Sequence, residues 1–233
     1  MRFDDVAARL RTLREPLPAG AELLNPELIS GELPAAPGAP RITPRVDDVA
    51  LAAEAYRPSA VLVLVFPDEA GEARVLLTAR PEADIRHPGQ IAFPGGATDP
   101  GDADPVATAL REAREEVGLD EAAAGVEVVG ALDPTVIPVS GFRLVPVLAL
   151  AATRPVLSAD AWEVRAIFDA PVERFLPGTP IEMVERDIGP GVRIRYGAFD
   201  VDGYRIWGAT ARILGQLGAV LAASYQGSPL EGS

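Results

Sequence analysis

The sequence of 233 residues contains no cysteine and a single histidine, His87. It therefore has no disulfide, no thiolate nucleophile and no metal site built from cysteine or from two histidines. No apolar run approaches the roughly 20 residues that a membrane-spanning helix needs, and the first residues, MRFDDVAARL, lack the apolar core of a signal peptide. We expect a soluble protein of the reducing cytoplasm.

Positive charge is also scarce. The chain has 21 basic and 34 acidic residues, which give a net charge of -13 at pH 7 and an isoelectric point near 4.5. Nucleic acids and anionic membranes are bound largely through lysine and arginine, so this balance argues against either partner. If the substrate is an anion, the binding site must reverse the sign of the potential locally.

The chain divides into a short N-terminal segment and one main domain. Residues 4–14 have the apolar spacing of a short amphipathic helix. Prolines then recur between residues 34 and 44, which excludes a regular helix or a central strand and indicates an extended connector. We expect residues 1–45 to form this helix and connector, and residues 46–233 to form the main domain.

Within the main domain the pattern predicts more strands than helices. Two runs, 59–66 and 73–80, are joined by the turn-rich PDEAGE and predict a hairpin. Further strands are predicted near residues 126–132, 143–150, 164–168, 181–187, 192–199 and 204–207, with a helix in the last part, ATARILGQLGAVLAASY. A mixed sheet flanked by helices, of class α+β, fits this order.

One helix is predicted with clear ends. Asp104 suits the N-cap, Pro105 the first helical position and Gly118 the termination. At about 100° per residue, an apolar stripe forms beside an acidic one. The apolar stripe consists of Val106, Ala109, Leu110, Ala113 and Val117, and the acidic one of Glu112, Glu115 and Glu116.

The acidic stripe predicts a site for a divalent cation. Glu112 and Glu116 stand four residues apart, where like charges oppose helix formation by roughly 0.2–0.5 kcal/mol. A solvated surface face is the ordinary alternative, but these acids border the buried stripe, have no lysine beside them and follow a glycine pair. Mg²⁺ and Mn²⁺ prefer such oxygen ligands and often bridge substrate phosphates. Arg111 can orient Glu115 at i+4, or form a plain surface ion pair with it.

Residues 95–119, GGATDPGDADPVATALREAREEVGL, resemble the Nudix box, a loop and helix that bind divalent metal in hydrolases of nucleoside diphosphate derivatives. The end of the box, from Arg111 to Leu119, matches residue by residue. The usual first acid corresponds to Asp102, and its spacing to Arg111 is one residue longer than the general pattern, as occurs in the coenzyme A branch of the family. The resemblance implies the Nudix fold, a mixed β-sheet between α-helices (α/β/α).

The preceding segment, LLTARPEADIRHPGQIAFPGG (residues 76–96), resembles the signature of coenzyme A diphosphatases. Pro81 stands in place of a small residue, and Ile85 stands where an arginine is expected, with Arg86 next to it. Segments 133–150 and 204–214 also resemble this branch, so the likeness covers roughly residues 58–217.

The resemblance implies a site and a reaction. Glu112, Glu115 and Glu116, with the Gly95 carbonyl, would hold Mg²⁺ or Mn²⁺, and Arg111 belongs to the same catalytic box. The small-molecule substrate would be coenzyme A or a related nucleotide, split at its diphosphate into 4'-phosphopantetheine and adenosine 3',5'-bisphosphate.

The phosphates and the attacking water need further groups. Arg80, Arg86 and His87 are candidates for contacting the substrate, with surface or loop-structuring roles as the alternatives. The general base is a glutamate of the box or an acid of the later segment SADAWEV, where Asp160 and Glu163 are the candidates.

Two other functions stay open. The substrate can be a different Nudix substrate, such as NADH, ADP-ribose or a noncanonical nucleoside triphosphate, and the departure at Ile85 keeps this alternative in place. The domain can also be a noncatalytic nucleotide sensor, although such a domain would be expected to lose box carboxylates that this chain keeps. A homodimer is an expectation that the sequence does not test.

Overall fold

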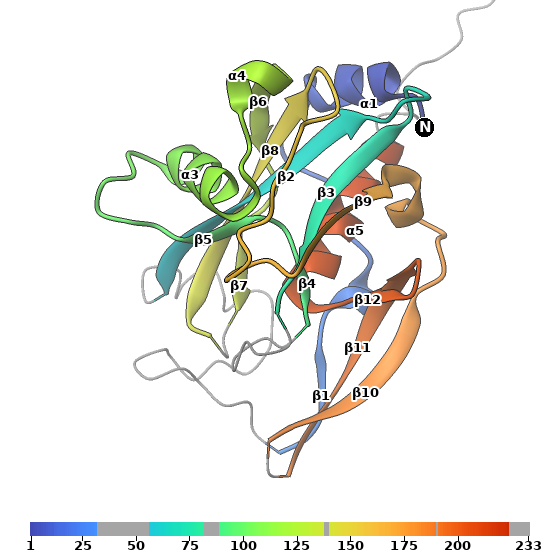
Figure 1. Ribbon diagram of the computed structural model, residues 1–233. Coiled ribbons are helices and arrows are strands. Elements are labelled where there is room, and N and C mark those ends of the chain that lie inside the picture. Colours follow the sequence, from blue (N-terminus) through green and yellow to red (C-terminus); the bar gives the residue numbers. More distant parts are fainter. Residues whose placement is uncertain (32–55, 82–88, 138–139, 190, 224–233) are drawn as a thin grey trace, which may run out of the picture.

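The computed structural model describes residues 1–31, 56–81, 89–137, 140–189 and 191–223. A mixed β-sheet lies between helices, and a smaller antiparallel sheet extends away from it (Figure 1). The helices are α1 (Phe3–Leu10), α3 (Pro105–Val117), α4 (Glu121–Ala124) and α5 (Gly208–Ala223), with 3-10 turns η1 (Glu22–Leu24) and η3 (Val172–Phe175). The strands of the main sheet are β2 (Arg57–Pro67), β3 (Ala73–Ala79), β4 (Ile91–Ala92), β5 (Gly95–Ala97), β6 (Val126–Ala131), β7 (Thr135–Ile137), β8 (Phe142–Ala151) and β9 (Ala166–Pro171).

β2 is the centre of the main sheet, in which the strand order is β4-β3-β2-β8-β6. It runs parallel to β8 and antiparallel to β3 and β5, while β9 pairs along β3 and β7 pairs with β8. β2 and β3 are joined by a tight turn, in which the Asp68 amide donates to the Glu72 carbonyl at 2.9 Å. The predicted hairpin and the predicted mixed sheet are confirmed.

The sequence of β2 explains its central place. Successive side chains of a strand point to opposite faces of the sheet, and an uninterrupted apolar run therefore needs cover on both faces. The side chains packed with α3 are Ala60, Leu62, Leu64 and Phe66, and those packed with α5 are Val61, Val63 and Val65. Both sets are buried, so the strand has no face that tolerates water.

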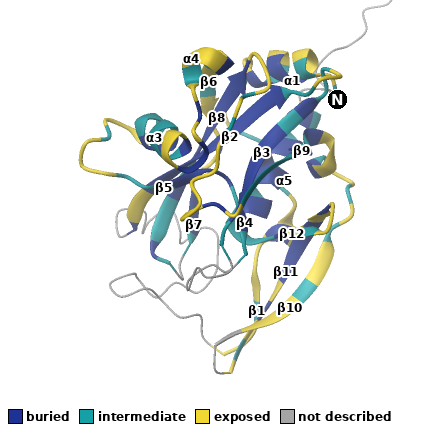
Figure 2. Ribbon diagram, in the orientation of Figure 1, coloured by how far each residue is buried: buried dark blue, intermediate teal, exposed yellow. Residues whose placement is uncertain are grey.

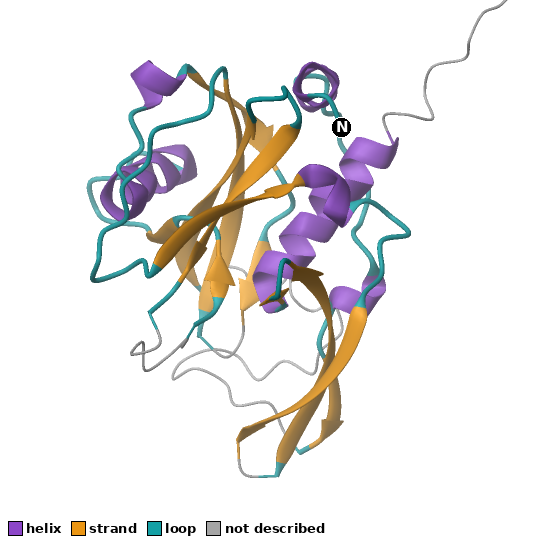
Figure 3. Ribbon diagram, turned by 45° about the vertical axis from the view of Figure 1, so that its right-hand side comes forward, coloured by secondary structure: helices purple, strands orange, loops and turns teal. Residues whose placement is uncertain are grey.

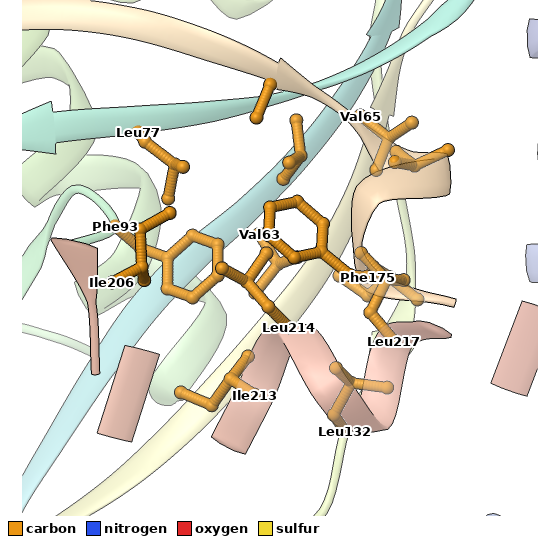
Figure 4. Packing of buried hydrophobic residues seen from close by; sticks show 14 of the residues in the cluster. Val63, Val65, Leu77, Phe93, Leu132, Phe175, Ile206, Ile213, Leu214 and Leu217 are labelled. Carbon is orange, nitrogen blue, oxygen red and sulfur yellow. The ribbon is translucent and has the colours of Figure 1, made fainter. Parts of the chain in front are cut away.

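Two hydrophobic cores lie on the two faces of the sheet. The larger one joins the sheet to α5, where Leu214 and Leu217 pack with Val63 and Phe175 (Figure 4). The smaller one holds α3 against the opposite face. The buried strands and the inward sides of these helices are seen in Figure 2, and the helices on either side of the sheet in Figure 3. The predicted α/β/α layering is confirmed.

The N-terminal helix α1 packs into the larger core through Val6, Ala7 and Leu10. The predicted helix at 4–14 therefore exists, but it ends at Leu10. The Thr12 hydroxyl donates to the carbonyls of Ala8 and Arg9 just beyond this end. The predicted proline connector lies in residues 32–55, outside the described residues. The division at residues 45 and 46 stays a prediction.

The smaller sheet contains β1 (Glu27–Ser30), β10 (Glu182–Gly189), β11 (Val192–Val201) and β12 (Tyr204–Ile206). Strands β10 to β12 fall where strands were predicted, whereas β1 was not predicted. Cross-strand pairs lie on its exposed surface: Arg195 sits opposite Glu185, with their charged groups 2.8 Å apart. Opposite charges in this position support strand pairing by roughly 0.2–1 kcal/mol. Among the described residues, no helix is long and apolar enough to cross a membrane.

Candidate active site

The helix α3 begins and ends where local signals predict. The Asp104 side chain accepts a hydrogen bond from the Ala107 amide at 2.8 Å, and Pro105 occupies the first turn. Gly118 terminates the helix with φ 63°, a left-handed conformation that glycine adopts readily. These caps set which side chains of α3 face the sheet.

The predicted apolar stripe of α3 faces the sheet. Ala109, Ala113 and Val117 are fully buried against it, while Val106 and Leu110 are half-buried at the margin. Small alanine side chains bring the helix close to β2 and β5. As a result Glu116, one turn beyond Glu112, is carried to the edge of the core and is itself buried.

The glycine pair of β5 lets the helix approach. A Cβ atom at Gly95 would lie 2.4 Å from the Ala60 carbonyl oxygen, and Gly95 has φ +156°. A Cβ atom at Gly96 would lie 2.5 Å from the Glu112 carboxylate. Glycine at position 95 therefore leaves room for the β2 backbone, and a side chain at position 96 would displace the Glu112 carboxylate.

Glu116 is the most buried acid of the site. It is 5 % exposed, and its Oε2 accepts a hydrogen bond from the Gly95 amide at 3.2 Å. Burial raises its pKa to about 7, and the nearby carboxylates of Glu112 and Glu163 act in the same direction, while the Arg80 guanidinium opposes them. A cation beside this group would restore its charge.

Glu112 is also affected by burial, which raises its pKa above the ordinary value. Hydrogen bonding from Arg111 opposes the shift, because Nη1 of Arg111 donates to Oε1 of Glu112 at 2.9 Å. The charges of Glu115 and Glu163 add to the effect of burial. The acidic stripe is therefore partly desolvated, unlike an ordinary solvated helix face.

Arg111 joins the helix to the loop before it. It donates to Glu115 Oε2 at 2.9 Å, as the i+4 spacing predicts, and also to Asp102 Oδ2 at 2.9 Å and to the Ala97 carbonyl at 3.0 Å. The guanidinium holds the pKa of Asp102 well below its usual range. Asp102, the counterpart of the first acid of the box, is thus the main anchor of Arg111.

A cavity of about 470 Å³ opens beside α3. Its lining residues are Arg80, Pro81, Gly95, Gly96, Ala97, Glu112, Glu116, Trp162 and Glu163. This volume is in the range of small-molecule sites, about 300–1,000 Å³. The structure therefore brings together Arg80, Gly95, Glu112 and Glu116 of the predicted site.

Other predicted residues lie elsewhere. Glu115 is outside the cavity lining, and its side chain is 58 % exposed and bound to Arg111. Arg86 and His87 lie outside the described residues, so their predicted contacts with the substrate stay predictions. Of the two candidate bases, Glu163 lines the cavity, whereas Asp160 shapes the turn through a hydrogen bond from the Trp162 amide at 2.8 Å.

Trp162 is a cavity residue that the sequence did not single out. Its position directly before Glu163 was the only signal in the sequence, and that signal says nothing about which way the ring faces. Its place follows from the turn at residues 160–164, which depends on contacts with α3.

The acidic side chains are of the type that binds a divalent cation, but their present positions do not form a metal site. Glu112 and Glu115 both contact Nη1 of Arg111. Across the described ranges, no three acidic or histidine side chains are placed as a ready metal centre. Carboxylates are nevertheless the oxygen ligands that Mg²⁺ and Mn²⁺ prefer.

Comparison with known proteins places this chain in a family. A family model described as the NUDIX domain matches residues 56–163. The chain is 37 % identical over 165 residues to a protein of Enterobacter sp. (strain 638) named "Uncharacterized Nudix hydrolase NudL", covering 69 % of this chain and 81 % of the relative. Such a match implies a mixed sheet that carries an acidic box helix, which is the arrangement of this fold. The chain belongs to the Nudix hydrolase family.

Plant relatives and solved structures match less completely. The chain is 37 % identical over 162 residues to "Nudix hydrolase 15, mitochondrial" of Arabidopsis thaliana, covering 67 % of this chain and 55 % of that relative. It thus spans little more than half the length of this plant protein. A Nudix hydrolase from M. smegmatis, RenU, aligns with a TM-score of 0.43 and 26 % identity, covering 51 % of this chain and 73 % of that one.

Proposed function

We propose that this chain hydrolyses the diphosphate bond of coenzyme A or a derivative with Mg²⁺ or Mn²⁺, giving 4'-phosphopantetheine and adenosine 3',5'-bisphosphate. Family membership supports a nucleoside diphosphate derivative as substrate. The resemblance of residues 76–96 to the coenzyme A diphosphatase signature supports the narrower choice. The observation that carries the proposal is the burial of Glu112 and Glu116 on an open cavity, where both have raised pKa values.

Glu112, Glu115 and Glu116 would hold the metal, with the Gly95 carbonyl as a further ligand. Nudix hydrolases generally need such an ion, which supplies positive charge to the phosphate oxygens and lowers the pKa of water. Arg111 positions the box by joining Glu112 and Glu115 to Asp102. Each of these groups belongs to α3, to β5 or to the loop between them, so the site is held largely on regular elements.

Glu163 is the better placed of the two candidate bases for accepting a proton from the attacking water. It lines the cavity with Glu112 and Glu116, and it comes from the segment between β8 and β9. Its charge also acts on Glu112 and Glu116, so it lies near both box acids although it comes from another segment. Its position is held by the Val164 amide, which donates to the Asp160 carbonyl at 2.8 Å.

Arg80 provides positive charge inside an otherwise acidic cavity. It lines the cavity at the end of β3, and its charge acts on Glu116. A guanidinium in this place can pair with phosphate oxygens in two-point contacts. We assign Arg80 to substrate binding, together with the predicted contacts of Arg86 and His87.

Incubation of the purified chain with Mg²⁺ and a panel of coenzyme A, acyl-coenzyme A, NADH and ADP-ribose tests the proposal. We expect coenzyme A or its acyl derivative to be cleaved with the highest kcat/KM. Preferred cleavage of NADH or ADP-ribose would assign another Nudix substrate. Tight nucleotide binding without turnover of any panel member would support the sensor function instead.

The composition of the chain supports a proposal about its partners and its compartment. A net charge of -13 argues against nucleic acid or an anionic membrane as partner, and we propose a small-molecule enzyme of the cytoplasm. A homodimer stays a prediction, and the mass of the purified chain in solution decides it.

A further inference from the structure

The segment between β8 and β9 places a tryptophan ring at the cavity. Trp162 is 90 % exposed and is nevertheless one of the residues that line the cavity beside Glu112 and Glu116. Within the described ranges its ring stacks on no other aromatic ring and carries no cation. The other tryptophan, Trp207, stacks on Tyr196 with ring centroids 4.8 Å apart. Trp162 therefore has a large apolar face with no described ring partner.

The backbone beneath this ring is anchored to the box helix. The Asp160 amide donates to the Glu116 carbonyl at 2.9 Å, and the Trp162 amide donates to the Asp160 side chain at 2.8 Å. Val164, just beyond the turn, is buried in the core beneath α3. Figure 1 shows this segment passing beside α3 on its way from β8 to β9. The ring is thus presented from a fixed turn and not from a free loop tip.

The cavity offers two chemically different surfaces. One side carries the carboxylates of Glu112, Glu116 and Glu163 with the guanidinium of Arg80, which suit a metal and a diphosphate. The second is supplied by Trp162, whose indole ring is flat and apolar and also lines the cavity. A nucleoside diphosphate derivative has the same two parts, a charged diphosphate and a flat aromatic base, joined through a ribose.

We infer that Trp162 is the stacking platform for the base of the substrate nucleotide, and that it favours substrates that carry a base over those that carry none. Stacking on an aromatic ring does not distinguish one base from another, because each base has a π face. The inference rests on the proposed function in requiring a nucleotide substrate, but it does not require that the nucleotide be coenzyme A.

Kinetics of Trp162→Ala with the best substrate of the panel tests the inference. We expect KM to rise about five- to a hundredfold, the range for one base stacked on one ring, with kcat within about threefold of the native value. Trp162→Phe should retain most of the native affinity. Val156→Ala is the matched control, because Val156 is 93 % exposed in the same segment and lies outside the cavity lining. A fall in kcat with unchanged KM in Trp162→Ala would overturn the inference.

Fluorescence measures the contact directly. In a Trp207→Phe background, Trp162 is the sole tryptophan of the chain. AMP and adenosine 3',5'-bisphosphate should quench its emission, whereas ribose 5-phosphate, which has no base, should not. If Trp207→Phe does not fold, the native chain is compared with Trp162→Ala. The part of the quench that the variant loses then reports on Trp162. Equal responses to AMP and ribose 5-phosphate would overturn the inference.

The two proposals fail in different ways. If coenzyme A is not cleaved but AMP quenches Trp162, the choice of substrate is wrong and the stacking platform stands. If coenzyme A is cleaved and Trp162→Ala leaves its KM unchanged, the platform is wrong and the proposed function stands.

Discussion

At the scale of single residues, the burial of Glu116 disfavours the negative charge of its carboxylate. It is buried at the cavity, accepts a hydrogen bond from the Gly95 amide and has a pKa raised to about 7. A carboxylate in this state is only partly ionised at neutral pH. The binding of a divalent cation would favour the ionised form, which is how a buried glutamate becomes a metal ligand.

Replacing Glu116 with glutamine tests this role. Glu116→Gln keeps the size of the side chain and its hydrogen bond from Gly95, and it removes the negative charge. We expect the fold to persist and kcat to fall by roughly a hundredfold or more, the range for losing a major electrostatic element. Steady-state kinetics at saturating Mg²⁺ measures the effect. Glu127→Gln, a surface substitution paired with Arg11, is the control, and native turnover in Glu116→Gln would contradict the assignment.

The raised pKa of Glu116 also predicts a pH-dependent stability. Its pKa is about 7 in the folded chain, against an ordinary glutamate pKa of 4.5 in the unfolded chain, so the unfolded chain releases its proton first as the pH rises. Stability from this group is complete below pH 4.5 and is lost as the pH rises through about 7. The loss is on the order of 3 kcal/mol at most. The free energy of unfolding, measured by urea titration with EDTA, should decrease less between pH 5 and pH 8 in Glu116→Gln than in the native chain. Equal decreases would contradict this account.

Residue roles were predictable to different extents. The acids of the box were recognisable because their spacing on one helix sets a common face. Glu163 and Asp160 could not be separated in sequence, since only the folded turn places one at the cavity and the other in a backbone hydrogen bond. Trp162 was missed for the same reason, because the direction of its ring depends on contacts between the turn and α3.

At the scale of elements, Arg111 connects α3 to the loop that precedes it. Its guanidinium contacts Asp102, Glu112 and Glu115 as well as the Ala97 carbonyl. Acceptors from a helix, a strand and a loop are held by one planar donor group, which a lysine cannot reproduce. The loop from β5 to α3 thus keeps its position relative to the box.

Arg111→Ala should therefore destabilise the chain more than Arg114→Ala. Removing Arg111 leaves the nearly buried Asp102 carboxylate without its main partner, at a cost of about 1–3 kcal/mol. Arg114 is half exposed and pairs with Glu121, so its removal should cost less than about 1 kcal/mol. Urea unfolding of both variants measures the difference, and equal losses would show that Arg111 does not organise the loop.

Elements with local signals were predicted well. The ends of α3 follow from Asp104, Pro105 and Gly118, all within the helix itself or one residue from it. The strand β1 was not predicted, because ELIS is short and its hydrogen-bond partner, β11, lies about 165 residues further along the chain. A pairing of such separation depends on the whole fold and leaves little local trace.

At the scale of the whole molecule, the N-terminal segment is packed into the domain. Leu10 of α1 and Leu24 of η1 belong to the same buried cluster as Leu214 and Leu217 of α5. The sequence indicated a packing helix here but not what it packs against. Through α5 and the sheet, this segment supports the layer that lies opposite the cavity.

Leu10→Ala should accordingly reduce the stability of the whole domain. A fully buried leucine replaced by alanine costs about 2–5 kcal/mol. Leu23→Ala removes the same atoms from an exposed position and should cost less than about 0.5 kcal/mol. The free energy of unfolding from urea titration separates the two. A Leu10→Ala variant as stable as Leu23→Ala would mean that the N-terminal segment is not part of the cooperative unit.

We propose that water attacks one phosphorus of a substrate diphosphate in the cavity beside α3. Hydrolysis of coenzyme A in ¹⁸O-water, followed by mass spectrometry of the products, tests it most directly. We predict 4'-phosphopantetheine and adenosine 3',5'-bisphosphate, with the label on only one of them and no inorganic phosphate. Release of inorganic phosphate, hydrolysis of an acyl thioester alone, or intact coenzyme A beside rapid cleavage of NADH or ADP-ribose would contradict the account.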